Sequence, residues 1–290
     1  MTILAGFSAA RHGVAPLALA CQIAGNTGEP VIAAAIVERR NPPMTDPVEN
    51  EYLDYVTTKA EQSLRAVVDT LPPGPEISVV VHRSTSIPSG ISELAQTHDA
   101  QVVTVGSSSS GLLGRITLGS VTDRLVHTAA VPVAIAPRGY GPVGGSVRRV
   151  TAAFGGLADV HGLVDGAARL ARQWRAELRV ASFSARDVVA FSGSIESGAE
   201  DLVIDQWWQR TRDRIAEQLD EARVDNPGAE VVIGVGRDWR RAVEDVPWAP
   251  GDLLLVGSGA AGLPARVFLG SAGSRIVRHS PVPVMIMPSR

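Results

Sequence analysis

The chain has 290 residues, of which 45% are hydrophobic and 20% charged, and its formal net charge is -3. These values are typical of a soluble globular protein of one or two domains, and they give no reason to expect a nucleic-acid partner. Lys59 is the only lysine, which excludes a Walker phosphate loop, because that loop needs a lysine directly after a glycine.

The cysteine content and the lengths of the apolar runs limit where in the cell the protein can be expected. Cys21 is the only cysteine, so neither an internal disulfide nor a cysteine-based zinc site is expected, and the six histidines show no metal-ligand spacing. No run of about 18 apolar residues exists to span a membrane. Arg11 and His12 interrupt the apolar run before Cys21, unlike a signal peptide. We therefore expect a cytoplasmic protein with no membrane partner and no metal site.

Short apolar strands alternate with helical patterns along the first half of the chain. Strands are expected at 3–6, 31–37, 77–81, 102–105 and 133–136, with helices at about 11–23, 48–71, 89–98 and 120–128. Fully apolar strands that alternate with helices are typical of a parallel sheet covered by helices on both faces.

The second half of the chain repeats the first. Residues 119–137 align without a gap with residues 270–288, and further strands are expected at 150–154, 178–183, 231–235, 253–257 and 284–287. Such a repeat indicates two copies of one domain, separated by a linker rich in glycine and proline. We therefore predict an α/β protein with domains 1–139 and 146–290, each a Rossmann-like, open, parallel five-stranded sheet.

A loop rich in glycine and serine joins the fourth strand to the following helix. It contains Gly106, Ser107, Ser109, Gly119 and Ser120. Ligands of such sheets bind at the carboxyl ends of strands where the strand order reverses. Glycine lets a phosphate approach closely, and a helix N-terminus, which Ser120 can cap, favours an anion. The loop is therefore either a phosphate cradle or a plain connector.

Through its strand order, its repeat and this loop, the chain resembles the universal stress protein family in its tandem two-domain form. The nucleotide-binding loop of that family has a glycine, two residues, a glycine, nine residues, then glycine and serine or threonine. Gly106, Gly119 and Ser120 match this pattern, whereas Ser109 replaces the second glycine. The resemblance implies a fold like that of the adenine nucleotide alpha hydrolases.

The resemblance also implies roles for two residues outside this pattern, and side-chain chemistry suggests a third. Ser8 stands where the first strand of the family ends in an aspartate that holds the ribose. The adenine is expected near Val37, at the end of the second strand, held by backbone groups. Arg115 lies in the loop and has the guanidinium chemistry that pairs with phosphate, although a solvated loop arginine is the alternative.

The second half keeps a poorer version of the same pattern. Gly257, Gly270 and Ser271 match, but Ala260 replaces the second glycine and Gly155 stands at the ribose position. We therefore expect a weaker second site.

Three functions follow as alternatives. The first is an adenine-nucleotide-binding regulatory module in stress response, which binds ATP or AMP and takes up magnesium only with the nucleotide. Its catalysis would be at most slow ATP hydrolysis, because no general base is evident. The second is an interaction scaffold with two degenerate sites. The third is an enzyme of the wider nucleotide-binding α/β group, which the missing lysine and histidine motifs disfavour. The last strands, 131–136 and 282–287, are expected to pair with each other or with those of a second chain in a homodimer, because edge strands invite pairing.

Overall fold

The computed structural model describes residues 2–8, 13–39, 47–154, 162–185, 228–257 and 271–288, together with residues 206, 209, 210, 213 and 217. The first half contains β1 (Thr2–Phe7), α1 (Ala15–Thr27), β2 (Val31–Glu38), α2 (Pro47–Val68), β3 (Ile77–Ser84), α3 (Ile87–Thr97), β4 (Ala100–Gly106), α4 (Ser120–Thr128) and β5 (Val133–Ala136). The second half contains β6 (Arg149–Phe154), α5 (Leu163–Trp174), β7 (Glu177–Ala185), β8 (Glu230–Gly236), α7 (Trp239–Glu244), β9 (Asp252–Gly257), α8 (Ser271–His279) and β10 (Val284–Met287).

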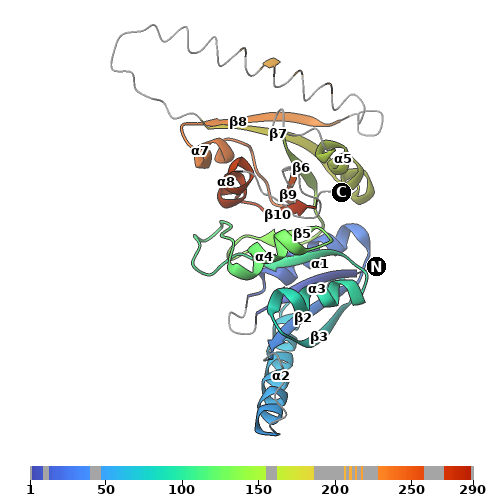
Figure 1. Ribbon diagram of the computed structural model, residues 1–290. Helices are drawn as coiled ribbons and strands as arrows, with labels where there is room; N and C mark the ends of the chain where they lie inside the picture. Colours follow the sequence, from blue (N-terminus) through green and yellow to red (C-terminus); the bar gives the residue numbers. More distant parts are fainter. Residues whose placement is uncertain are drawn as a thin grey trace, which may run out of the picture.

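The ten described strands form a single sheet in the order β3-β2-β1-β4-β5-β10-β9-β6-β7-β8 (Figure 1). Strands pair in parallel within each half, as the apolar strand runs predicted. Among the described strands, the only antiparallel pair joins the halves, with Val284 opposite Ile135 and Ile286 opposite Val133. The α/β fold is thus confirmed, while the two predicted sheets are halves of one continuous sheet.

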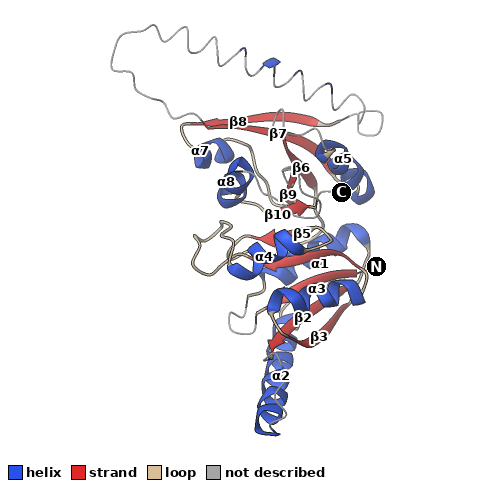
Figure 2. Cartoon of the chain, viewed as in Figure 1, coloured by secondary structure: helices blue, strands red, loops and turns tan. Residues whose placement is uncertain are grey.

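Helices cover both faces of this sheet (Figure 2). One buried apolar cluster receives side chains from α1, α2 and α5, and the other receives them from α3, α4, α7 and α8. Each cluster therefore runs across the junction between the halves. Among the described residues, no helix has the length and apolar character needed to cross a membrane.

Helix α1 ends later than the sequence predicts, at a glycine that terminates it. Helix α4 has the expected bounds, but α1 continues beyond Ile23 to Thr27. It ends at Gly28, which has a φ of 70° and donates its N–H to the carbonyl of Ala24. Glycine adopts this left-handed conformation at little cost, and so it terminates the helix.

Candidate functional site

The strand order of the first half reverses between β1 and β4, which lie side by side. Ala5 is opposite Thr104, so the two strands end at the same level, β1 just before Ser8 and β4 at Gly106. Ser8 is exposed. In open parallel sheets this position is where ligands bind, and here the glycine- and serine-rich loop leaves the sheet.

The loop is closed by its own hydrogen bonds. The Ser107 hydroxyl accepts a hydrogen bond from the Thr117 N–H at 2.7 Å and donates one to the Thr117 carbonyl at 3.3 Å. The Ser108 N–H donates to the same carbonyl at 2.7 Å. The Ser107 side chain therefore holds the two arms of the loop together, a structural role that the sequence pattern did not indicate.

The far end of the loop is fastened to the residues that follow β5. Gly114 donates its N–H to the Arg138 carbonyl at 2.8 Å, and Arg138 donates its own N–H to the Arg115 carbonyl at 3.0 Å. The Arg138 side chain also donates to the Gly111 carbonyl at 2.5 Å. The backbone of the loop is thus fixed to the sheet at both ends, which makes its geometry a property of the fold.

The N-terminus of α4 lies at the base of the loop. Gly119 occupies the capping position with a φ of -85°, and no side chain caps this end of the helix. The expectation that Ser120 caps the helix is therefore wrong, because Ser120 is already its first residue. The first backbone N–H groups of a helix have no partner within the helix, and together with the helix dipole they favour an anion.

The glycines of the loop differ in whether the surrounding atoms leave space for a side chain. A Cβ on Gly111 would lie 2.4 Å from the Thr117 hydroxyl, so packing requires glycine there. A Cβ on Gly119 would come no closer than 3.5 Å to Ser108, and one on Gly106 no closer than 3.4 Å to Pro16. The internal packing of the protein therefore does not demand glycine at 106 or 119, which leaves room for a ligand.

The remaining predicted residues of the first half are dispersed. Ser109 is exposed in the loop, while Val37 is 6% exposed and pairs with Arg83 near the ends of β2 and β3. Arg115 forms an ion pair at 2.5 Å with Glu244 of α7 in the second half. The structure thus brings Gly106, Gly119 and Ser120 together, and it directs the Arg115 side chain toward the other half.

The second site lies only partly within the described residues. Gly257 ends β9, beside β6, and Ser271 begins α8, which matches the arrangement in the first half. Gly270, the loop that contains Ala260, and Gly155 all lie outside the described residues.

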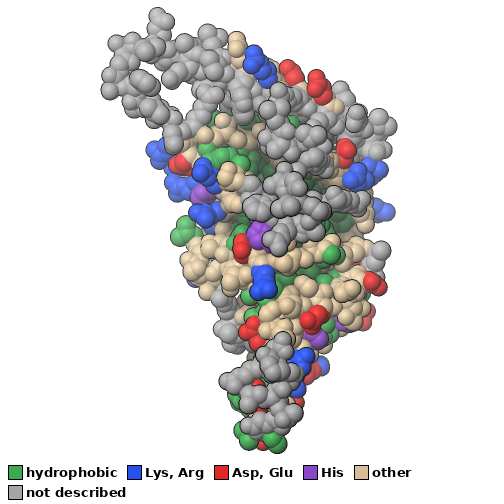
Figure 3. Space-filling model, viewed as in Figure 1, with side chains coloured by type: hydrophobic (Ala, Val, Ile, Leu, Met, Phe, Trp, Pro, Cys, Tyr) green, Lys and Arg blue, Asp and Glu red, His purple; other side chains and the backbone are tan. Residues whose placement is uncertain are grey.

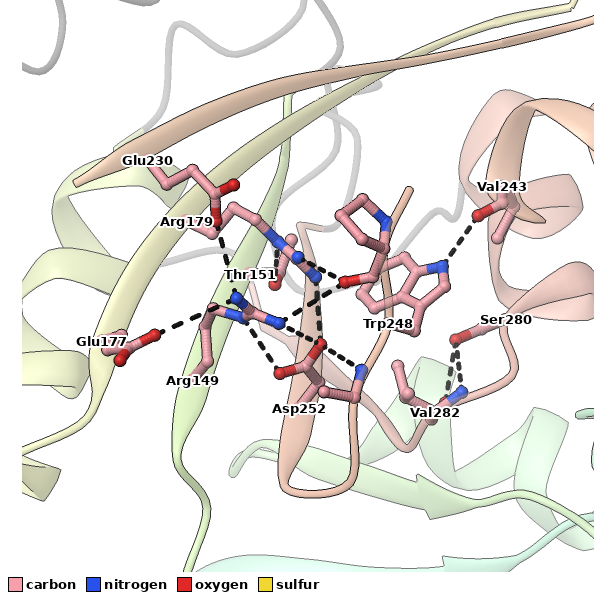
Figure 4. A network of polar contacts seen from close by, with 12 residues as sticks. Arg149, Thr151, Glu177, Arg179, Glu230, Val243, Trp248, Asp252, Ser280 and Val282 are labelled. Carbon is pink, nitrogen blue, oxygen red and sulfur yellow. Dashed lines mark hydrogen bonds and ion pairs between the residues drawn. The ribbon is translucent and has the colours of Figure 1, made fainter. Parts of the chain in front are cut away.

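A buried polar network, which the sequence analysis did not anticipate, lies at the amino end of the second-half strands (Figure 4). Arg179 is fully buried and donates hydrogen bonds to Thr151, to the Pro247 carbonyl and, at 3.2 Å, to Asp252. Arg149 also binds Asp252, at 2.9 and 3.0 Å. The one sequence feature that could have indicated this network is Arg179, a charged residue within a predicted apolar strand. The network lies at the end of the sheet opposite the loop, which points to a structural role.

Comparisons with known proteins agree with this architecture. The sequence model of the universal stress protein family matches residues 1–137 and 146–288. Universal stress proteins of Mycobacterium tuberculosis and Mycobacterium bovis are each 31% identical over 295 residues, which covers 99% of this chain and 100% of theirs.

Solved structures show the same fold at lower identity. A universal stress protein from Archaeoglobus fulgidus is 17% identical with a TM-score of 0.60, over 99% of this chain and 98% of that one. A putative universal stress protein from Pseudomonas aeruginosa is 16% identical with a TM-score of 0.60, over 99% and 93% of the two chains.

Proposed function

Because the chain belongs to the universal stress protein family, we propose that its first half is a regulatory module that binds an adenine nucleotide, ATP or AMP, in stress response. The observation that carries this proposal is the N-terminus of α4, which no side chain caps and which adjoins Gly106 at the point where strand order reverses. Such an end supplies N–H groups and a positive dipole to a phosphate without any lysine.

The proposed contacts follow from the positions of the residues. The backbone of Gly106, Gly119 and Ser120 binds the phosphates, with Ser109 on the exposed side of the loop. Ser8 donates to or accepts from the ribose, and magnesium enters only with the nucleotide. A neutral hydroxyl contributes about 1.4 kcal/mol less than a carboxylate to such a hydrogen bond, so the affinity is about tenfold weaker than with an aspartate.

The adenine lies beside the end of β2, where backbone groups near Val37 hold it. Gly257, Gly270 and Ser271 form the second, weaker site. About one nucleotide therefore binds per chain, and it binds the first half. No catalytic residue is proposed.

Titration calorimetry with ATP tests this assignment through a matched pair of variants. Gly119→Val places a branched side chain where a phosphate must approach, and the backbone at Gly119 tolerates a side chain because its φ is -85°. This variant should lose binding but keep its fold. Gly270→Val makes the same change at the corresponding position of the repeat and should change binding little. Loss of binding in Gly270→Val alone would assign the nucleotide to the second half.

A scaffold without a nucleotide is the second candidate, favoured by Ser109 in place of the loop glycine and by the engagement of Arg115 with Glu244. A ligand that binds the native state must raise its stability. Wild-type protein that shows neither heat nor a thermal shift at millimolar ATP would establish the scaffold and exclude the nucleotide module.

A further inference from the structure

Exposed arginines gather on one face of the second half, over α7 and α8 (Figure 3). We call this surface the arginine face, and it consists of Arg237, Arg240, Arg241, Arg275 and Arg278. Helices α7 and α8 pack against each other, and the Arg275 guanidinium lies 5.9 Å from the centre of the Trp239 ring. The face is therefore one continuous surface of the fold.

The first half, a copy of the same domain, keeps one arginine of this face, because Arg124 corresponds to Arg275 in the gapless repeat. Ser86 caps α3 as Asp238 caps α7, which aligns the two helices. The positions of Arg240 and Arg241 then correspond to Pro88 and Ser89. Most of the arginine face is thus specific to the second half and does not follow from the shared fold.

The positive charge of this face is only partly neutralised. Glu244 lies 3.7 Å from Arg241 but already pairs with Arg115 at 2.5 Å. Within the described part of the chain, no ion pair engages Arg240 or Arg278. Burial, followed by the charges of Arg278, Arg115 and Arg240, lowers the pKa of the neighbouring His279. The arginine charges are the smaller part of that shift, and the charge of Asp238 opposes them.

Helix α2 carries the opposite chemistry at the other end of the molecule, where it extends away from the sheet (Figure 1). Its first turns contain Glu49 and Glu51, together with Asp54, which already pairs with Arg83 at 2.6 Å. Tyr52 and Tyr55 lie three residues apart on one side of the helix and are 63% and 61% exposed. A surface that combines carboxylates with exposed tyrosine rings suits arginine, which pairs with the former and stacks on the latter.

We propose that the arginine face of one molecule binds the first turns of α2 of a second copy, head to tail. Each surface also carries charges of the minority sign, Asp238 and Glu244 on the face and Lys59 on the helix. Mixed charges fit another protein surface better than the uniformly negative backbone of a nucleic acid.

The contact has definite physical properties. One helix end offers less area than a permanent interface buries, so association is weak and falls as salt screens the charges. Because two different surfaces meet, a bound pair still has one free face and one free helix, and the assembly grows into rings or chains.

Sedimentation velocity over a wide range of protein concentration, at low and high salt, tests the proposal. The variant Arg240→Glu/Arg278→Glu disables the face, and Glu51→Arg/Tyr55→Ala disables the helix. Each should weaken association by at least about tenfold, because like charges then meet in the contact. The control Arg124→Glu/Arg169→Glu changes the net charge by the same amount as the face variant, on exposed arginines outside the arginine face. It should associate as the wild type does.

Mixing the two disabled variants gives the sharpest result. The face variant still offers its α2, and the helix variant still offers its face, so the mixture should form pairs of two chains and nothing larger. Circular dichroism establishes that both variants are folded.

Three outcomes would overturn the proposal. The wild type stays monomeric at low salt up to its solubility limit, the control weakens association as much as the face variant, or the mixture forms no pairs although both variants are folded. A fluorescent oligonucleotide that binds wild type but not the face variant, without self-association, would assign the face to nucleic acid instead.

Discussion

Tyr140, just beyond β5, is held against α1 of the first half by its side-chain hydroxyl. Its hydroxyl donates a hydrogen bond to the side-chain carbonyl of Gln22 in α1. Burial raises the pKa of Tyr140 to about 12 from 10.0. The protein therefore stabilises the neutral phenol, because a phenolate in this environment would lose its hydration.

This shift predicts a loss of stability at alkaline pH. Since the pKa is raised in the folded state, the contribution of Tyr140 is fully present below pH 10.0 and disappears as the pH rises toward about 12. Tyr140→Phe should flatten the pH dependence of the urea midpoint in this window and lose about 1 kcal/mol at neutral pH with the hydrogen bond. Tyr55→Phe, on an exposed tyrosine, serves as the control. An unchanged alkaline profile in Tyr140→Phe would contradict the assignment.

Strands β6, β7 and β9 are tied together at their amino ends by the polar network of Figure 4. Asp252, 3% exposed, accepts hydrogen bonds from Arg149, Arg179 and the Ala249 N–H. The Trp248 ring lies 4.8 Å from the Arg179 guanidinium and covers it. A buried charge of this kind is tolerated only because it is paired and hydrogen-bonded.

Removing the carboxylate should therefore be costly. Asp252→Asn leaves the fully buried Arg179 without its counter-ion, and we expect the free energy of unfolding to fall by about 3 kcal/mol. Glu177 is another acidic neighbour of Arg149, but its side chain is 77% exposed. Glu177→Gln should therefore cost less than about 1 kcal/mol. Urea unfolding measures both. Equal effects of the two variants would show that the network adds no stability through burial.

The two halves are joined along the β5–β10 pair, through both apolar clusters and by polar contacts that cross the junction. The Asn26 amide in α1 donates to the carbonyls of Val147 and Trp174 at 2.8 and 2.9 Å, and its carbonyl accepts the Val147 N–H at 2.7 Å. On the other face, Arg115 of the glycine- and serine-rich loop pairs with Glu244 of α7. The loop of the proposed nucleotide site is thus in direct contact with the second half.

A double-mutant cycle measures this link. Arg115→Gln and Glu244→Gln should each lower the free energy of unfolding, and the double variant should lose less than their sum, with a coupling of about 1 kcal/mol for a partly buried pair. The side chains are 23% and 28% exposed, so high salt should weaken the coupling only in part. Additive effects would mean that the two side chains do not interact in solution.

Much of the fold follows from the sequence because its signals are local. An apolar run specifies a buried strand from its own residues, so the ten predicted strands lie close to their observed places. The gapless repeat specified two similar halves, and the bounds of α4 followed from its own pattern. The family also followed from the repeat and the loop spacing, and the match to both halves confirms it.

Tertiary structure decided what depends on partners far away in the sequence. Ser107 closes the loop because Thr117 folds back to meet it, and Arg115 is an interface residue because Glu244, on another helix, reaches it. Arg179 is tolerated in an apolar strand only because Asp252 arrives from 73 residues away. A residue's own neighbours determine its backbone, whereas the partner of a charge or an edge strand is determined by which distant segments the fold brings within hydrogen-bonding distance.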